Sequence, residues 1–333
     1  MIKKEKFSLA LIGRTEWLLN TGKLLHENGF KIKIIISSKN AEWDPISPQD
    51  FKKFSQKINS KYIFTENINS SEIKKQIKDL NLDLGISVNN RLLISKEMLS
   101  LFGHGILNAH PGDLPRFRGN ACPNWAILKD EKRIGLTVHF MDEKLDNGDI
   151  IKKDFIKIND STTILEVYNF LNKQIPNSIL ESVKKIHSGK YRTTKQDNKK
   201  MLRTYPRNKI DGKIDWSKSA DYIHRIIRIS GEPFFGAYTY LGSTKLILLN
   251  AKKEYPKYEY FSEFGQIVER RKNGEIVVSC LDGFVVITKV KFKNKIYDRP
   301  SEVIKTVYTR LGMDVEGEIE KILEKLENLS KNR

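Results

Sequence analysis

The chain has 333 residues, of which 39% are hydrophobic and 30% charged, and its formal net charge is +18. This length is greater than that of a typical single-core domain and predicts two or three domains. No apolar run reaches the roughly 18 residues that span a bilayer. The short apolar run after the first basic residues leads into Arg14 and Glu16 instead of a cleavage site, which predicts a first strand of a cytoplasmic protein, not a signal peptide.

Two cysteines, Cys122 and Cys280, lie far apart and belong to no paired motif. Their placement argues against a disulfide framework or a cysteine metal site and fits a reducing compartment. The positive charge admits two interpretations, a polyanionic partner such as tRNA or a lysine-rich solvated surface. Because the lysines are scattered among Glu and Asp, the second interpretation is favoured.

Apolar strands alternate with helices along the first 110 residues. The sequence predicts helices at 16–28, 49–58 and 70–80 and strands at 7–13, 31–37, 61–65, 83–88 and 105–110, with a short helix before the last strand. This alternation predicts βαβ units and an α/β fold with a doubly wound, mostly parallel, Rossmann-like sheet. The turn GRTEW after the first strand has one glycine, so neither a dinucleotide fingerprint nor a P-loop is present.

The next segment completes a first domain, expected over 1–192. Strands are predicted at 135–142 and 149–158, and a helix at 161–189 begins with Ser/Thr and a capping-box Glu and contains Pro176 as a kink. The polar, basic run 193–209 is predicted to be a linker.

The second part of the chain changes character. A short helix at 217–229 precedes strands at 237–241, 245–252, 265–271, 274–281 and 283–292, a pattern typical of a small β-barrel over 210–312. A terminal helix over 313–333 carries a heptad-type stripe of Val315, Ile319, Ile322, Leu326 and Leu329. Two heptads are short, which favours packing on the protein's own body over a dimer zipper and leaves a homodimer open.

Residues 106–119, ILNAHPGDLPRFRG, concentrate polar chemistry at the end of a predicted strand. The carboxyl edge of a parallel sheet is where reactive side chains collect, and the i, i+2 spacing of Asn108 and His110 sends both side chains to one face. Pro111 takes the chain out of the sheet. Taken alone, an Asn that caps a turn and a His bonded to backbone explain these two residues equally well.

A second turn, KLDNGDII at 144–151, brings Asp146 into consideration. Together the motifs NAHP, LPRFRG and LDNG closely resemble the active-site signature of the folate-dependent formyltransferases in order, residue type and spacing. The resemblance covers most of the chain, because 207–241 also resembles the linker and the start of the barrel-like C-terminal domain of that family. It implies the formyltransferase fold.

The resemblance implies a role for each residue of the set. The donor would be 10-formyltetrahydrofolate, and a primary amine would attack its formyl carbon. Asn108 would donate to the oxyanion, a role worth roughly 3 kcal/mol in other enzymes. His110 would donate to the same oxygen or accept the amine proton, and Asp146 would orient His110 and shuttle protons.

The resemblance also implies an apolar slot for the folate pterin. Its walls would come from the strand-end loop and from the MDEKLD loop, with Leu92, Leu93, Ile94, Leu114, Met141 and Asp142 as cofactor-binding residues. Each of these leucines could equally be ordinary core. No metal is implied, and His104 and His139 have no ligand spacing that would link them.

The acceptor amine is not decided by the three-residue set. Methionyl-tRNA formyltransferases usually continue the catalytic loop as RGAAP-I, whereas this chain reads RGNACPNWAIL, which resembles the amino-sugar enzymes. Asn124 and Trp125 are therefore assigned to acceptor binding with Arg14, although Trp125 could equally be helix packing. The segment 37–53 contains Glu42, Asp44 and Asp50 and is not the basic arm of the tRNA enzymes.

The sequence therefore favours N-formylation of a nucleotide-activated amino sugar. A 4-amino-4,6-dideoxy sugar of surface polysaccharide (lipopolysaccharide) biosynthesis is the acceptor that the resemblance implies. Methionyl-tRNA formylation is the alternative, supported by the net charge and the basic linker. A non-catalytic nucleic-acid-binding protein on the same scaffold is the third hypothesis, against which the intact Asn–His–Asp set argues. No membrane partner is expected.

Overall fold

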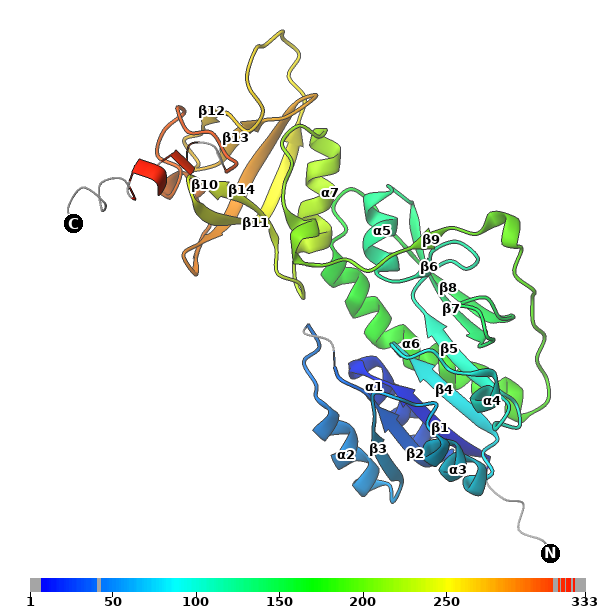
Figure 1. Cartoon of the computed structure of the whole chain (residues 1–333). Helices are drawn as coiled ribbons and strands as arrows, with labels where there is room; N and C mark the ends of the chain where they lie inside the picture. The colour runs from blue at the N-terminus through cyan, green and yellow to red at the C-terminus, as the bar shows by residue number, and fades with distance from the viewer. Residues whose placement is uncertain are drawn as a thin grey trace, which may run out of the picture. The chain divides into compact units, whose positions relative to one another are not determined.

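The structure is a computed structural model that describes residues 7–40, 43–313 and, beyond these, 317, 319, 320, 322–324 and 326. The chain divides into two compact units, Met1–Pro206 and Arg207–Arg333 (Figure 1). In the predicted terminal helix (313–333), Met313 is not helical, whereas residues 317, 319, 320, 322–324 and 326 are. Val315 and Leu329 of its apolar stripe lie outside the described residues.

The first unit is built on a seven-stranded sheet of order β3-β2-β1-β4-β5-β7-β8. β1 to β5 run parallel, and β7 and β8 add two antiparallel strands at one edge. The strands are β1 (Ser8–Gly13), β2 (Lys31–Ser37), β3 (Lys61–Phe64), β4 (Leu84–Val88), β5 (Ile106–His110), β7 (Arg133–Phe140) and β8 (Ile150–Lys157). The prediction of a doubly wound, mostly parallel sheet is confirmed.

Helices cover both faces of this sheet (Figure 1). On one face α3 and α4 bury their apolar residues against Ala10, Ile12 and Ile34. On the other face Gly22 of α1 contacts Leu11 of β1 and Phe54 of α2, and α6 packs on α1. The helices are α1 (Thr15–Glu27), α2 (Pro48–Lys57), α3 (Ser71–Leu80), α4 (Lys96–Leu99), α5 (Cys122–Leu128) and α6 (Ile164–His187). Because both faces are covered, the central strands are apolar on both sides.

Local sequence signals set the helix boundaries. Thr163 and Glu166 form the predicted capping box at the start of α6, and the helix runs through Pro176. Ser70 caps α3 by accepting a hydrogen bond from the backbone of Ile73. Such caps satisfy backbone N–H groups that the first turn leaves unpaired.

The segment that follows α6 packs on the first unit. Thr194 pairs with Ile150 of β8, and the short helix η1 (Asn198–Lys200) follows it in the chain. After η1, β9 (Arg203–Thr204) pairs with β6 (Arg118–Gly119) as a two-stranded ladder. Residues up to Pro206 therefore belong to the first unit.

The second unit is an antiparallel sheet of order β10-β11-β14-β13-β12, with β15 paired to β14. Residues 309–312 bridge its two edges, because Leu311 pairs with Leu241 at the end of β10 while Arg310 pairs with Gln266 just before β12. This closure gives the barrel-like form that the sequence predicts. The elements are η2 (Lys209–Gly212), α7 (Ala220–Ser230), β10 (Ala237–Leu241), β11 (Thr244–Glu254), β12 (Ile267–Arg270), β13 (Ile276–Ser279), β14 (Phe284–Phe292), β15 (Lys295–Tyr297) and η3 (Pro300–Glu302).

Candidate active site

The site lies at the carboxyl edge of the parallel sheet, where the direction of chain progression changes between β1 and β4. Gly13 of β1 pairs with Val88 of β4, and Val88 pairs with Ala109 of β5. Adjacent strands are about 5 Å apart, so the turn after β1 and the end of β5 lie about 10 Å from each other. This edge is where open α/β sheets bind their ligands.

A tight turn between β7 and β8 delivers Asp146. The Asp142 carboxylate accepts hydrogen bonds from the backbone of Lys144 at 2.9 Å and from the Asn147 amide at 2.6 Å. A Cβ on Gly148 would lie 1.9 Å from the Phe140 carbonyl oxygen, so only glycine fits there. Asp146 itself takes a left-handed conformation with φ 49°, which Asp tolerates. The LDNG motif is thus a folding requirement of the turn as well as a source of chemistry.

Asp146 faces the end of β5. Its Oδ2 lies 3.6 Å from Nδ1 of His110 and accepts a 2.9 Å hydrogen bond from the backbone N–H of Gly119. The Nε2 of His110 donates to the Phe117 carbonyl oxygen at 2.6 Å. The three residues that the sequence singled out, Asn108, His110 and Asp146, therefore lie together at one sheet edge.

Asn108 is held by His139, for which the sequence offers no role beyond an unsupported metal ligand. His139 of β7 lies directly opposite Asn108 in the β5–β7 register, and the Asn108 amide donates to its Nε2 at 3.2 Å. The Nδ1–H of His139 donates to the Phe140 carbonyl oxygen at 2.8 Å, which leaves Nε2 as an acceptor. His139 thus fixes the orientation of the Asn108 amide.

The two histidines titrate in opposite directions. Burial alone would lower the pKa of His110, but the Asp146 carboxylate, then Cys122 and last the Phe117 carbonyl outweigh burial and raise that pKa above its ordinary value. Burial, opposed by Asp146 and assisted by the charge on His110, lowers the pKa of His139 from 6.5 to about 4. At neutral pH the cluster holds an imidazolium at 110 and a neutral imidazole at 139.

The segment after α6 packs on the turn between β7 and β8 that carries Asp146, called the catalytic turn below. The Gln196 amide donates to the carbonyl oxygens of Asp146 and Gly148 at 2.9 and 2.8 Å, and its own oxygen accepts from the buried Arg118 guanidinium. Sequence reasoning treated residues 193–209 as a linker and missed this contact, because a lone Gln in a polar run carries no local signal.

Cys122 adds a second feature that the sequence did not signal. Its buried thiol lies 3.5 Å from Nε2 of His110 and 3.0 Å from the Phe117 carbonyl oxygen. Both cysteines are free and buried. The thiol helps to close the space behind the imidazole.

The residues assigned to the pterin slot fall into three places. Leu92, Leu93 and Ile94 follow β4 in one loop. The Asn90 side chain fixes this loop by donating to the Leu92 carbonyl oxygen and accepting from the Leu92 N–H, and Leu93 is 74% exposed. Met141 packs on the same core cluster as Leu92 and Ile94, so the 90–95 loop and the loop of Met141 and Asp142 are neighbours. Lys96, the first residue of α4 directly after the 90–95 loop, pairs with Glu143. Leu114 is fully buried in the turn after β5.

The residues assigned to the acceptor lie on two sides of the sheet edge. The Arg14 guanidinium donates to the Asn89 carbonyl oxygen at 3.2 Å, and burial, together with the nearby Arg91, lowers its pKa. Asn124 is 3% exposed in α5. The indole N–H of Trp125 donates to the Tyr205 carbonyl oxygen at 2.8 Å, so Trp125 anchors the chain that follows β9.

Beside Arg14 the chain carries strain and unpaired polar atoms. Thr15 has φ 74°, an outlier for a β-branched residue, and such strain collects at functional sites. Its Oγ1, the Oγ of Ser38 and the Oδ2 of Asp44 are buried without a hydrogen-bond partner among the described residues. Burial raises the pKa of Asp44 to about 6. These groups are available to a polar ligand.

The arrangement suits chemistry at a carbonyl carbon. An amide donor and an imidazolium can stabilise an oxyanion, and the adjacent carboxylate can accept a proton from an attacking nucleophile. Within the described part of the chain, no group of three or more His, Cys, Asp or Glu side chains could hold a metal ion. The same residues contain no helix both long and apolar enough to span a bilayer.

Comparison with known proteins agrees with this chemistry. Residues 8–183 match the family described as formyl transferase, and residues 207–306 match the formyl transferase C-terminal domain. A methionyl-tRNA formyltransferase of Fusobacterium nucleatum subsp. nucleatum is 28% identical over 277 residues, which cover 83% of this chain and 89% of that protein.

Solved structures share the fold. WlaRD, a sugar 3N-formyl transferase solved with dTDP and 5-N-formyl-THF, superposes with a TM-score of 0.62 at 20% identity, over 87% of this chain and 99% of that one. The N-formyltransferase from Helicobacter canadensis, in complex with folinic acid and dTDP-3-aminofucose, gives a TM-score of 0.61 at 19% identity, over 84% and 97% of the two chains. The chain belongs to the formyl transferase family and is a formyltransferase.

Proposed function

We propose that the protein transfers the formyl group of 10-formyltetrahydrofolate to the primary amine of a nucleotide-activated amino sugar. The observation that carries this proposal is the cluster of Asn108, His110 and Asp146, set in register with the Arg14 turn at the β1–β4 edge. One side of that edge supplies the groups for formyl transfer, and the other supplies a cationic, polar place for the acceptor.

In the proposed reaction the amine lone pair attacks the formyl carbon, and the carbonyl electrons move to its oxygen. The Asn108 amide, oriented by His139, donates to that oxygen, and the His110 imidazolium stabilises its charge. Asp146 accepts the proton that the amine loses. As the intermediate collapses, the bond from carbon to the folate nitrogen breaks and that nitrogen takes up the proton.

The folate is proposed to lie between the 90–95 loop and the loop after β7. Leu92, Leu93, Ile94, Met141 and Asp142 would line its pterin, with Leu114 from the catalytic loop. The shared core cluster and the Lys96–Glu143 ion pair support this placement because they hold the two loops side by side. Both structural relatives described above contain a folate, 5-N-formyl-THF or folinic acid.

The acceptor is proposed to enter beside Arg14. Arg91 contributes to the lowered pKa of Arg14, so an anionic phosphate beside Arg14 would offset the repulsion between these two cations. Arg91 also pairs with Glu66 at 3.3 Å. Thr15 and Asp44 offer unpaired polar atoms to sugar hydroxyls. Asn124 and Trp125, in the helix after the catalytic loop, would border the sugar. Both structural relatives contain dTDP or a dTDP-linked aminosugar.

Methionyl-tRNA is the alternative acceptor, and two observations favour it. The curated relative with 28% identity is a methionyl-tRNA formyltransferase, and the net charge of +18 suits a polyanion. The sugar remains our choice because the RGNACPNW loop departs from the tRNA-enzyme pattern. A formylated nucleotide sugar would next be consumed by a glycosyl transfer, as in surface polysaccharide or lipopolysaccharide assembly.

The experiment offers both acceptors to the full-length protein with 10-formyltetrahydrofolate. Release of tetrahydrofolate is followed with a panel of nucleotide-linked amino sugars, 4-amino-4,6-dideoxy sugars included, and in parallel with charged initiator tRNA. Turnover with a sugar alone supports the proposal, and turnover with tRNA alone replaces it by the alternative. Failure with both acceptors would favour a non-catalytic nucleic-acid-binding protein.

A further inference from the structure

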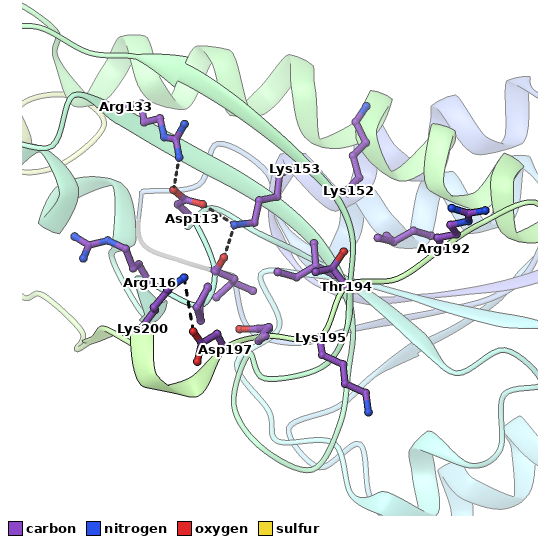
Figure 2. A pocket seen from close by; sticks show the side chains of 15 residues that line it. Asp113, Arg116, Arg133, Lys152, Lys153, Arg192, Thr194, Lys195, Asp197 and Lys200 are labelled. Atoms are coloured by element: carbon purple, nitrogen blue, oxygen red, sulfur yellow. Dashed lines mark hydrogen bonds and ion pairs between the residues drawn. The ribbon is translucent and has the colours of Figure 1, made fainter.

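A cavity separate from the Arg14 edge opens behind the catalytic loop of the first unit. Its volume is about 580 Å³, and this open pocket is lined by the turn 113–116, by β8 and by the segment 192–200, whose Arg192 and Lys195 are exposed. Figure 2 shows cationic side chains spread around it: Arg116 and Arg133 near the turn, Lys152 and Lys153 from β8, and Arg192, Lys195 and Lys200 from the segment after α6. Asp113 and Asp197 are the carboxylates in the lining.

Two of these cations share one carboxylate. Asp113 accepts from both Arg133, at 3.1 Å, and Lys153, at 2.7 Å, so one carboxylate faces two positive charges. Lys153 also donates to the Leu114 carbonyl oxygen. The cavity therefore holds an excess of positive charge around Asp113.

Other cations of the cavity are paired from outside it. Arg116 pairs with Glu131, and Lys152 pairs with Glu181 and Asp154. Lys200 Nζ lies 3.7 Å from a carboxylate oxygen of Asp197.

Arg192 and Lys195 complete the excess. Neither has an acidic partner among the residues that the structure describes, and both side chains line the cavity (Figure 2). Like charges around one cavity repel each other, and an anionic ligand bound there offsets that repulsion.

The lining selects the chemistry of the ligand. Among the residues that the structure describes, no aromatic ring borders the cavity, and so none of them offers a surface on which a nucleobase could stack. Guanidinium and ammonium groups bind phosphate through charge-assisted hydrogen bonds, and the volume lies within the range of small-molecule sites. We propose that this cavity binds the linked phosphates of a small ligand, a pyrophosphate or the diphosphate of a nucleotide, at a second site apart from the acceptor crevice.

The site adjoins the catalytic turn without belonging to it. Gln196 lines the cavity and also donates to the carbonyl oxygen of Asp146 at 2.9 Å. An anion that contacts the segment 192–200 would therefore act on the same segment that holds the Asp146 turn. The inference does not depend on which amine the enzyme formylates.

The test is calorimetric titration of the full-length protein with inorganic pyrophosphate. The variant Arg192→Gln/Lys195→Gln removes the two unpaired cations, and the control Lys52→Gln/Lys75→Gln removes two exposed charges from α2 and α3, away from the cavity. We expect wild type and control to bind alike and the cavity variant to bind roughly tenfold or more weakly, as expected for lost charge-assisted hydrogen bonds. An equal loss in the control, or no binding by wild type, overturns the proposal.

Two further arms identify the source of the phosphates. A nucleoside diphosphate that displaces pyrophosphate from wild type, and that also binds weakly to the cavity variant, supports a small ligand. A short RNA that binds wild type and not the cavity variant, while pyrophosphate fails to compete, makes the cavity part of a nucleic-acid surface and overturns the small-ligand proposal.

Discussion

Replacement of His139 by Leu tests how the site holds its oxyanion donor. The neutral imidazole accepts the Asn108 amide at 3.2 Å in a buried place. Loss of a buried hydrogen bond that leaves its partner unpaired costs about 1 to 2 kcal/mol, and this cost falls on the transition state if Asn108 turns away. We therefore expect kcat to fall by about 5- to 30-fold with little change in KM for the folate.

The control is a double-mutant cycle with Asn108→Ala. Loss of the donor itself is expected to lower kcat by roughly 10²- to 10³-fold. Because His139 acts through Asn108, adding His139→Leu to Asn108→Ala should cost almost nothing more. His139→Gln, which keeps an acceptor, should recover part of the rate. Steady-state kinetics with thermal unfolding as a check on folding supply the data, and fully multiplicative losses in the double variant would refute a positioning role for His139.

The remaining predictions concern the carboxylate, the loop and the pH response. His110→Ala and Asp146→Asn should each lower kcat by about 10²-fold or more while the folate Kd, measured by fluorescence titration, stays nearly unchanged; near-normal rates would remove these residues from the mechanism. Gly119→Ala should lower the unfolding free energy by about 1 to 3 kcal/mol, because a Cβ there would lie 2.2 Å from the Thr204 carbonyl oxygen. It should also reduce kcat, because the Gly119 N–H donates to Asp146. A normal denaturation midpoint would contradict this. Since the pKa of His139 is lowered to about 4, its contribution to stability is fully present above about pH 6.5 and is lost as pH falls toward 4. In denaturant titrations the unfolding free energy of His139→Leu should therefore fall less steeply with acid than that of wild type. Identical pH slopes in the two proteins would disprove the assignment.

Much of the site could be predicted because its signals are local. A strand that ends in Asn-x-His-Pro places two polar side chains on one face and then leaves the sheet, which depends only on the period of a strand and on the proline ring. The LDNG turn likewise combines a left-handed Asp146 with a glycine that cannot carry a Cβ. The alternation of strands and helices predicts the doubly wound sheet for the same reason, since each element buries its own apolar pattern.

The parts that sequence reasoning missed depend on long-range pairing. His139 meets Asn108 only because β7 runs antiparallel to β5 in one register, and a His inside the apolar strand GLTVHFMD gives no hint of its partner. Gln196 lies 50 residues after Asp146, and the strands β6 and β9 are two residues each, too short for a periodic signal. The closure of the second sheet by residues 309–312 likewise has no local pattern.

The central claim is tested most directly by the identity of the product. The full-length enzyme is incubated with 10-formyltetrahydrofolate and a nucleotide-linked amino sugar, and the sugar nucleotide is analysed by mass spectrometry, with Asp146→Asn as the control. We predict the mass increment of one formyl group on the sugar nucleotide, formed in equal amount to the tetrahydrofolate released and absent in the control. An unmodified sugar nucleotide, together with formylated methionyl-tRNA from the same enzyme preparation, would contradict the proposed acceptor.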